Sequence, residues 1–132
     1  MEEYGKKQFK FKGKSIEELK KLDVREFAKL LDSRARRFIL RNFQELETFI
    51  NRSRKKNANN KPIKAHQRDL VIVPEMSGWK IAVHKGNEFE QFTITDEMIG
   101  HKLGEFALTR KKTVHTKVGT GATKGSKVET KR

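Results

Sequence analysis

The stretch that most constrains the fold is residues 68–110, because it has the longest continuous pattern of a compact structure. Leu70–Val73 is an apolar run closed by Pro74, and Trp79–His84 and Glu88–Ile94 alternate apolar and polar residues. Alternation with a period of two is typical of a strand with one buried face. The pattern predicts three strands, the last two of which form a hairpin.

A short helix is expected to follow the third strand. Thr95 can cap its first turn, where the acidic residues Asp96 and Glu97 suit the positive end of the helix dipole. Gly104 is placed to end it. Its apolar side would consist of Met98, Ile99 and Leu103. The predicted fold class is therefore α+β, with a small three-stranded mixed or antiparallel sheet and short packed helices.

Four further helical turns are expected before this unit. Ser15 and Asp23 each stand three residues before a glutamate, which is the spacing of a capping box. Ser33 and Asn42 are candidate caps of two more turns. With 132 residues and no repeat of domain size, one domain is expected. Its predicted parts are a basic and aromatic arm (1–14), a helical extension (15–56), a linker (57–64), the α+β unit (65–110) and a basic flexible tail (111–132).

Positive charge is concentrated outside the α+β unit. The formal net charge of the chain is +14, and residues 31–62 hold nine Lys and Arg against three Asp and Glu. Residues 109–132 hold eight against one, whereas residues 63–108 hold five against seven. A chain with this excess attracts polyanions, so nucleic acid or an anionic membrane surface is the expected partner, and basic flanks around a nearly neutral unit favour nucleic acid. The tail, which contains no aromatic residue, should stay disordered without such a partner.

Several classes of function lack their motifs. The chain has no cysteine, no nucleophile elbow and no Walker-type phosphate loop. No apolar run approaches the roughly 18 residues of a membrane span. His101 and Glu105 are four residues apart, but Gly104 is expected to separate them. We therefore expect no catalytic site, no metal, no cofactor, no small-molecule substrate and no membrane partner.

Two groups of cations in the helical extension are candidate RNA contacts. Their number exceeds what complementing helix dipoles requires, and guanidinium groups bind phosphate through two parallel hydrogen bonds. The candidates are Arg34, Arg36, Arg37 and Arg41, followed by Arg52, Arg54, Lys55 and Lys56. In the arm, Tyr4, Phe9 and Phe11 alternate with lysines, which fits either stacking on RNA bases or packing against the helices.

Two stretches resemble a known family. The first is Pro74-Glu75-Met76 with Gly78, followed by Lys80-Ile81-Ala82-Val83-His84 and Gly86. The second, more specific stretch is Glu97-Met98-Ile99-Gly100-His101-Lys102-Leu103-Gly104-Glu105-Phe106-Ala107-Leu108-Thr109-Arg110. Together they resemble the universal small-subunit ribosomal protein nineteen family. The added front helices and His66-Gln67-Arg68-Asp69 resemble its archaeal and eukaryotic branch.

This resemblance implies a non-enzymatic, cytoplasmic component of the small-subunit head. Its partners would be 3′-domain ribosomal RNA, neighbouring head proteins and, through the C-terminal tail near the decoding region, tRNA. The positions carried over as RNA contacts, with the basic residues beside them, are Lys64, His66, Arg68, the turn Glu75–Gly78, Lys80, His101, Lys102, Thr109, Arg110, Lys111 and Lys112. Two alternatives share the charge: a free-standing nucleic-acid-compacting protein, and a basic nuclease for which the sequence offers no catalytic group.

Overall fold

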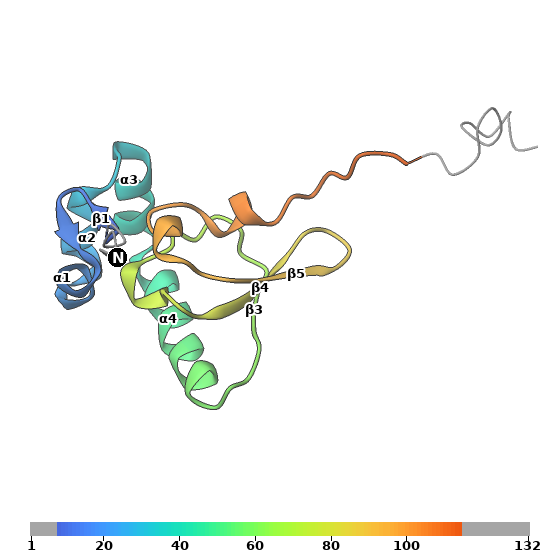
Figure 1. Cartoon of the computed structure of the whole chain (residues 1–132), viewed down its shortest axis with the longest axis horizontal. Coiled ribbons are helices and arrows are strands. Elements are labelled where there is room, and N and C mark those ends of the chain that lie inside the picture. The colour runs from blue at the N-terminus through green and yellow to red at the C-terminus, as the bar shows by residue number, and fades with distance from the viewer. Residues whose placement is uncertain (1–7, 115–132) are drawn as a thin grey trace, which may run out of the picture.

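The computed structural model describes residues 8–114, which form an α+β fold (Figure 1). Helices α1–α3 gather at one end, α4 runs beside the sheet, and the β4–β5 hairpin projects at the opposite end (Figure 1). This confirms the predicted fold class. The expectations for Tyr4 and for the tail from residue 115 onward lie outside the described residues.

Four α-helices occupy most of the first half of the described chain, and only the first has the predicted capping box. They are α1 (Ile16–Lys21), α2 (Val24–Leu30), α3 (Ser33–Arg41) and α4 (Phe43–Ala58). The backbone N–H of Glu18 donates to Ser15 Oγ at 3.4 Å, and the N–H of Ser15 donates to the Glu18 carboxylate at 3.2 Å.

Asp23 and Asn42 stand at the predicted N-caps of α2 and α4, but the expected side-chain hydrogen bonds are absent there, and the cap predicted at Ser33 is wrong. Asp32 rather than Ser33 stands at the N-cap of α3. The side-chain amide of Asn42 donates backward to the Phe38 carbonyl at 3.2 Å. Short helices of this kind gain most of their stability from a buried apolar face rather than from their caps.

The described part of the arm forms a two-stranded hairpin of β1 (Lys10–Phe11) and β2 (Lys14–Ser15). Lys12 and Gly13 between them have φ values of 48° and 80°, the left-handed conformations that a two-residue hairpin turn requires. The Phe11 ring lies 5.9 Å from the Phe27 ring and packs against the core. For Phe11, the packing alternative is therefore the one that the structure favours.

The three-stranded sheet is mixed. β3 (Ile63–Ala65) pairs in parallel with β4 (Lys80–His84), and β4 pairs antiparallel with β5 (Phe89–Thr93). The predicted hairpin is confirmed, but the third strand lies in what the sequence suggested was a linker. The 57–64 segment contains the end of α4 and the start of β3. The division into domains stays a prediction.

Leu70–Val73 is not a strand of the sheet, so this prediction is wrong. Its four residues are 0–1% exposed, and its backbone bonds to the loop that follows β5. Ile72 N–H donates to the His101 carbonyl at 2.8 Å, and Leu103 N–H donates to the Leu70 carbonyl at 3.0 Å. The apolar run thus lies in the middle of the core, where its backbone still needs hydrogen-bond partners.

The prediction of one helix after β5 is also wrong. Two short 3₁₀ turns replace it, η2 (Asp96–Met98) and η3 (Leu103–Phe106), and a third, η1 (Pro74–Met76), precedes β4. Gly100, between the two turns, has a φ of +87°, which is incompatible with a continuous right-handed helix. None of the described helices is both long and apolar enough to cross a membrane.

Candidate nucleic-acid interface

The basic face of α3 consists of Arg34, Arg37 and Arg41. Burial of Ile39, with Ala35 and Phe38 half-buried, fixes which side of the helix meets the core. The three arginines are three and four residues apart, so they share the outward side, and all three are exposed. Three guanidinium groups along one helix face can bind successive phosphates of an RNA backbone.

A shallow cleft beside α3 brings together predicted site residues that are far apart in sequence. Arg34, His101 and Lys102 all line this cleft, whose volume is about 340 Å³. Lys102 Nζ also lies 5.6 Å from the centre of the Phe38 ring, which holds the ammonium against α3. The loop between η2 and η3 thus adds its charges to the basic face of α3.

Lys12 and Asp32 also line the cleft beside α3. The sequence assigned Lys12 only to the basic arm, because nothing local shows that the β1–β2 hairpin folds back onto α3. The turn residues Lys12-Gly13 are a sequence feature from which the hairpin itself could have been predicted. Arg36 differs from its neighbours, since its Nη2 donates to the Leu31 carbonyl at 3.1 Å.

The cations of α4 form a separate patch. Arg52, Arg54, Lys55 and Lys56 are exposed in the last turns of the helix. At 1.5 Å per residue, Arg54 lies about 16 Å along the axis from the start of α4. The two groups of cations that the sequence predicts as RNA contacts therefore lie on two separate surfaces, one on α3 and one at the end of α4.

Arg54 is already paired within the chain. Its Nη2 and Nε lie 2.6 Å and 2.7 Å from Glu75 Oε1. The two side chains are 61% and 39% exposed, so water screens the pair and its contribution to stability is below about 1 kcal/mol. The pair places the turn Glu75–Gly78, a predicted RNA contact, next to the basic end of α4.

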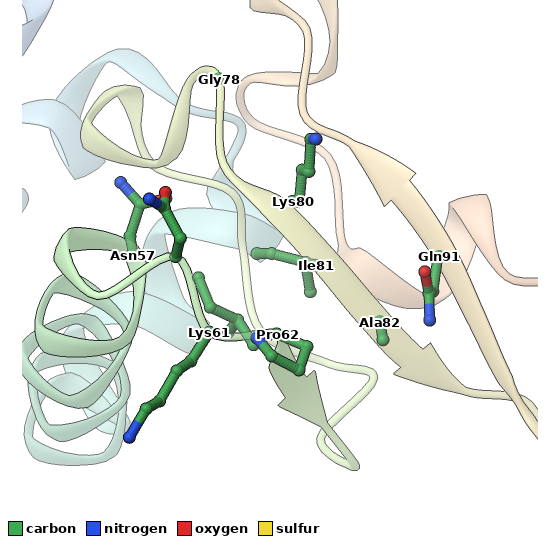
Figure 2. Close-up of a pocket in the computed structure, with 10 residues that line it drawn as sticks. Asn57, Lys61, Pro62, Gly78, Lys80, Ile81, Ala82 and Gln91 are labelled. Atoms are coloured by element: carbon green, nitrogen blue, oxygen red, sulfur yellow. The ribbon is translucent and has the colours of Figure 1, made fainter.

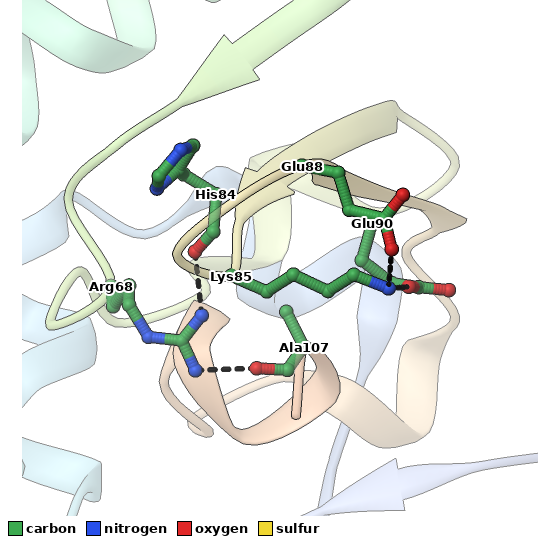
Figure 3. A network of polar contacts seen from close by, with 6 residues as sticks. All are labelled: Arg68, His84, Lys85, Glu88, Glu90 and Ala107. Atoms are coloured by element: carbon green, nitrogen blue, oxygen red, sulfur yellow. Dashed lines mark hydrogen bonds and ion pairs between the residues drawn. The ribbon is translucent and has the colours of Figure 1, made fainter. Parts of the chain in front are cut away.

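Arg68 donates hydrogen bonds to three backbone carbonyls of the chain. Its Nη1 donates to the His84 carbonyl at 2.6 Å, and its Nη2 donates to the Ala107 carbonyl (Figure 3). The same Nη2 also donates to the Gly104 carbonyl at 2.9 Å. A Cβ at Gly104 would lie 3.0 Å from Arg68 Cβ, so the close approach needs glycine there. Arg68 is half-buried and positions the end of η3 against β4. Its predicted RNA contact stays a prediction.

The remaining candidates of the sheet lie on its outer face or at the chain exit. Lys64, His66 and Lys80 are exposed, and each follows or belongs to β3 or β4. Thr109, Arg110, Lys111 and Lys112 are all exposed where the chain leaves η3. Figure 1 shows this exit directed away from α1–α3.

A small ion network borders the exit. Lys85 Nζ lies 2.9 Å from Glu88 Oε1 and 2.7 Å from Glu90 Oε2 (Figure 3). The hydrogen bond from Lys85, together with the charges of Lys85 and Lys111, lowers the pKa of the Glu88 carboxyl. The hydrogen bonds to Glu88 and Glu90 raise the pKa of Lys85. The lowered pKa favours the charged form of the Glu88 carboxyl, next to the basic exit segment that contains Lys111.

His101 and Glu105 do meet, contrary to the expectation that Gly104 separates them. His101 Nδ1 lies 2.8 Å from Glu105 Oε2, because the turn η3 carries Glu105 back toward the loop. Both side chains are about half exposed. Within residues 8–114, no three His, Asp or Glu side chains are grouped as metal ligands. The arrangement offers exposed guanidinium and ammonium groups for binding phosphate.

Comparisons with known proteins agree with this surface chemistry. A family model described as ribosomal protein S19 matches residues 37–115. The small ribosomal subunit protein uS19 of Saccharolobus solfataricus is 47% identical over 124 residues, which cover 91% of this chain and 89% of that protein. The uS19 protein of Methanocella arvoryzae is 45% identical over 123 residues, covering 92% of this chain and 86% of the relative.

Proposed function

Because this chain belongs to the ribosomal protein S19 family and is a non-enzymatic component of the small ribosomal subunit, we propose that it binds ribosomal RNA of the subunit head. Family membership places the chain on the ribosome in the cytoplasm. It also argues against the nuclease and the free-standing nucleic-acid-compacting protein. The proposed partners are 3′-domain ribosomal RNA and the neighbouring head proteins.

The observation that carries the RNA-binding proposal is the basic face of α3 beside its cleft. Arg34, Arg37 and Arg41 are exposed on one side of the helix, and Lys102 adds a fourth cation. RNA helices are recognised mainly by shape and through phosphate and 2′-hydroxyl contacts. A row of arginines on a rigid helix suits the role of positioning a protein on the backbone.

The test replaces Arg34, Arg37 and Arg41 with alanine together. The slope of log affinity against log salt should fall by about 0.9 for each lost duplex phosphate contact. Binding of the variant to a transcript of the small-subunit 3′ domain, measured at several salt concentrations, gives this slope.

The matched control replaces Lys20, Lys21 and Lys29 with alanine, which also removes three exposed positive charges, from α1 and α2. This control should keep the slope of the unaltered chain. An α3 variant whose slope equals that of the control would show that the basic face of α3 lies off the RNA.

The proposal extends to the other exposed cations and to the chain exit. The α4 patch would make further contacts with the RNA backbone through Arg52 and Lys55, which do not take part in the ion pair with Glu75. Lys64 and Lys80 on the sheet would do the same. Arg110, Lys111 and Lys112 would follow the RNA where the chain leaves η3. From there the tail would extend toward the decoding region and tRNA, a path that the resemblance to the family implies. The excess of positive charge in the tail supports only the contact with RNA along that path.

A further inference from the structure

One face of the three-stranded sheet, which we call the open face, carries the exposed side chains of Lys64, Lys80, Gln91 and Thr93, while Ala82 at its centre is 3% exposed. Ile63, Ala65, Ile81 and Val83 are 0–2% exposed and point into the core. Side chains alternate along a strand, so their neighbours point outward. The register pairs Lys64 with Ala82, and Ala82 with Gln91, in one row, with Lys80–Thr93 and His84–Phe89 as the flanking rows.

The open face carries positive charge and no carboxylate in these three rows. Lys64 and Lys80 are exposed on it. The acidic residues of the hairpin, Glu88 and Glu90, alternate with Phe89 and Gln91, so they point to the other side and bind Lys85. The face is therefore complementary to a polyanion.

Three rings gather at the hairpin end of the open face, and we call them the ring cluster: His66, His84 and Phe89. The two imidazoles are stacked, with centroids 5.1 Å apart and an angle of 27° between their planes. Phe89 meets each of them edge-on at 5.1 Å. Lys64 Nζ lies 5.2 Å from the centre of the Phe89 ring. His66 is exposed, so the stack ends on a ring that solvent reaches.

A pocket of about 480 Å³ borders the other end of the open face (Figure 2). Its apolar lining residues are Pro62, Ile63, Ile81 and Ala82, and its amide-bearing ones are Asn57, Asn60 and Gln91. Lys61 and Lys80 stand at the same pocket. Amide groups both donate and accept hydrogen bonds, as the edges of nucleobases do.

We infer that the open face of the sheet binds a single-stranded segment of RNA, with one unpaired base stacked on His66 of the ring cluster. The base continues the stack that His84 begins, and Lys64 and Lys80 bind the adjoining phosphates. The amide-lined pocket receives a neighbouring nucleotide. This inference rests on the proposed function, since it assigns a second RNA contact apart from the basic face of α3.

The chemistry of the open face favours RNA over a protein partner. Unpaired bases are recognised by stacking on aromatic or histidine side chains beside cations that follow the backbone. The core of a protein–protein interface is instead depleted in charge, and lysine is among the residues it avoids. Here the rings are flanked by exposed lysines.

The test uses the full chain and two probes. One is an oligoadenylate of about ten nucleotides, within the range of single-strand site sizes, carrying a fluorescent 2-aminopurine. The other is the transcript of the small-subunit 3′ domain. His66→Leu removes the stacking ring, His66→Phe keeps one, and Gln67→Leu is the control for an added apolar side chain at an exposed neighbour outside the ring cluster.

Stacking should quench the fluorescence with the unaltered chain, with His66→Phe and with Gln67→Leu. Loss of one stacked base should make the binding of His66→Leu about 5- to 150-fold weaker. Replacing Lys64 or Lys80 with alanine should lower the salt slope by about 0.7 each, the value for single strands. Unchanged thermal unfolding of each variant shows that the fold is intact.

Two results would overturn the inference while the proposed function stands. The first is a His66→Leu variant that binds both probes as the unaltered chain does. The second is a variant that binds RNA normally but loses a neighbouring ribosomal protein, which would make the open face a protein interface. If the unaltered chain binds neither probe, the proposed function fails with it.

Discussion

Arg68 joins three parts of the chain that are distant in sequence. Its guanidinium donates to the carbonyls of His84 at the end of β4, Gly104 within η3 and Ala107 just after η3. Hydrogen bonds from a charged donor are about twice as strong as those between neutral groups. By bonding to β4 and to η3 at once, Arg68 therefore fixes where the C-terminal segment leaves the fold.

Replacing Arg68 with methionine should lower the free energy of unfolding by about 2–4 kcal/mol, because three half-buried carbonyls lose a charged donor. Urea unfolding of the full chain measures the change. Arg110→Met is the control, since it removes an exposed arginine and should shift stability by less than about 0.5 kcal/mol. Equal stability of the two variants would contradict the conclusion that the hydrogen bonds of Arg68 stabilise the fold.

Single residues show what sequence reasoning can and cannot reach. The resemblance pointed to His66, but the ring cluster also needs His84 and Phe89, which only the fold brings to it. The position of His84 and Phe89 on either side of a hairpin turn was a usable signal, because residues flanking such a turn pair across it. No local pattern shows that Arg68 bonds to carbonyls up to 39 residues away.

At the scale of elements, Gly100 allows the chain after β5 to return along Leu70–Val73. It adopts a φ of +87° between the two 3₁₀ turns, and its N–H donates to the Ile72 carbonyl at 2.9 Å. A Cβ there would lie 3.0 Å from Leu31 Cδ2 and 3.3 Å from Phe11 Cζ. Glycine is therefore favoured here for two reasons. The backbone adopts a positive φ, and Leu31 and Phe11 leave no room for a Cβ.

Gly100→Ala should therefore destabilise the chain more than Gly78→Ala. Gly78 has nearly the same φ, +85°, but no atom within 4 Å of the added Cβ. Gly78→Ala measures the backbone strain alone, about 1–2 kcal/mol. Gly100→Ala adds overpacking of about 1–3 kcal/mol. Thermal or urea unfolding gives both values, and equal destabilisation would show that Leu31 and Phe11 move aside freely.

The elements were predictable where their pattern is local. The β4–β5 hairpin follows from alternation on both sides of turn residues, and the Ser15 capping box follows from its spacing. β3 was missed because three residues, Ile63–Ala65, are too short to show a period beside a polar segment. The burial of Leu70–Val73 was expected from its composition, but its hydrogen-bond partners were not, because sequence pattern does not specify long-range pairing.

At the scale of the whole molecule, the candidate contacts occupy four separated surfaces. They are the basic face of α3, the α4 patch, the open face of the sheet and the exit at Thr109–Lys112, which belong to different parts of the fold. Charge alone predicted a polyanion partner, but it could not show that the contacts are distributed over a scaffold. A protein with this layout is suited to holding several RNA segments in a fixed relation.

The proposed path of the tail can be tested with one introduced thiol, because the chain has no cysteine of its own. Val114, 76% exposed, is the last described residue of the exit segment. An iron chelate attached to Val114→Cys in reconstituted small subunits should cleave RNA near the decoding region and bound tRNA. The same probe at Lys29→Cys on α2 should give a different pattern. Identical patterns would contradict the proposed path.

During synthesis, Leu70–Val73 is made before the residues that complete its hydrogen bonds. Its partners lie between Gly100 and Leu103, and η3 follows them. Helices α1–α4 depend on local contacts and can form early, whereas pairing across such a sequence separation comes late. A nascent chain that stops short of Gly100 therefore displays four consecutive apolar residues. Such a fragment, rather than the finished protein, is the form that chaperones should recognise.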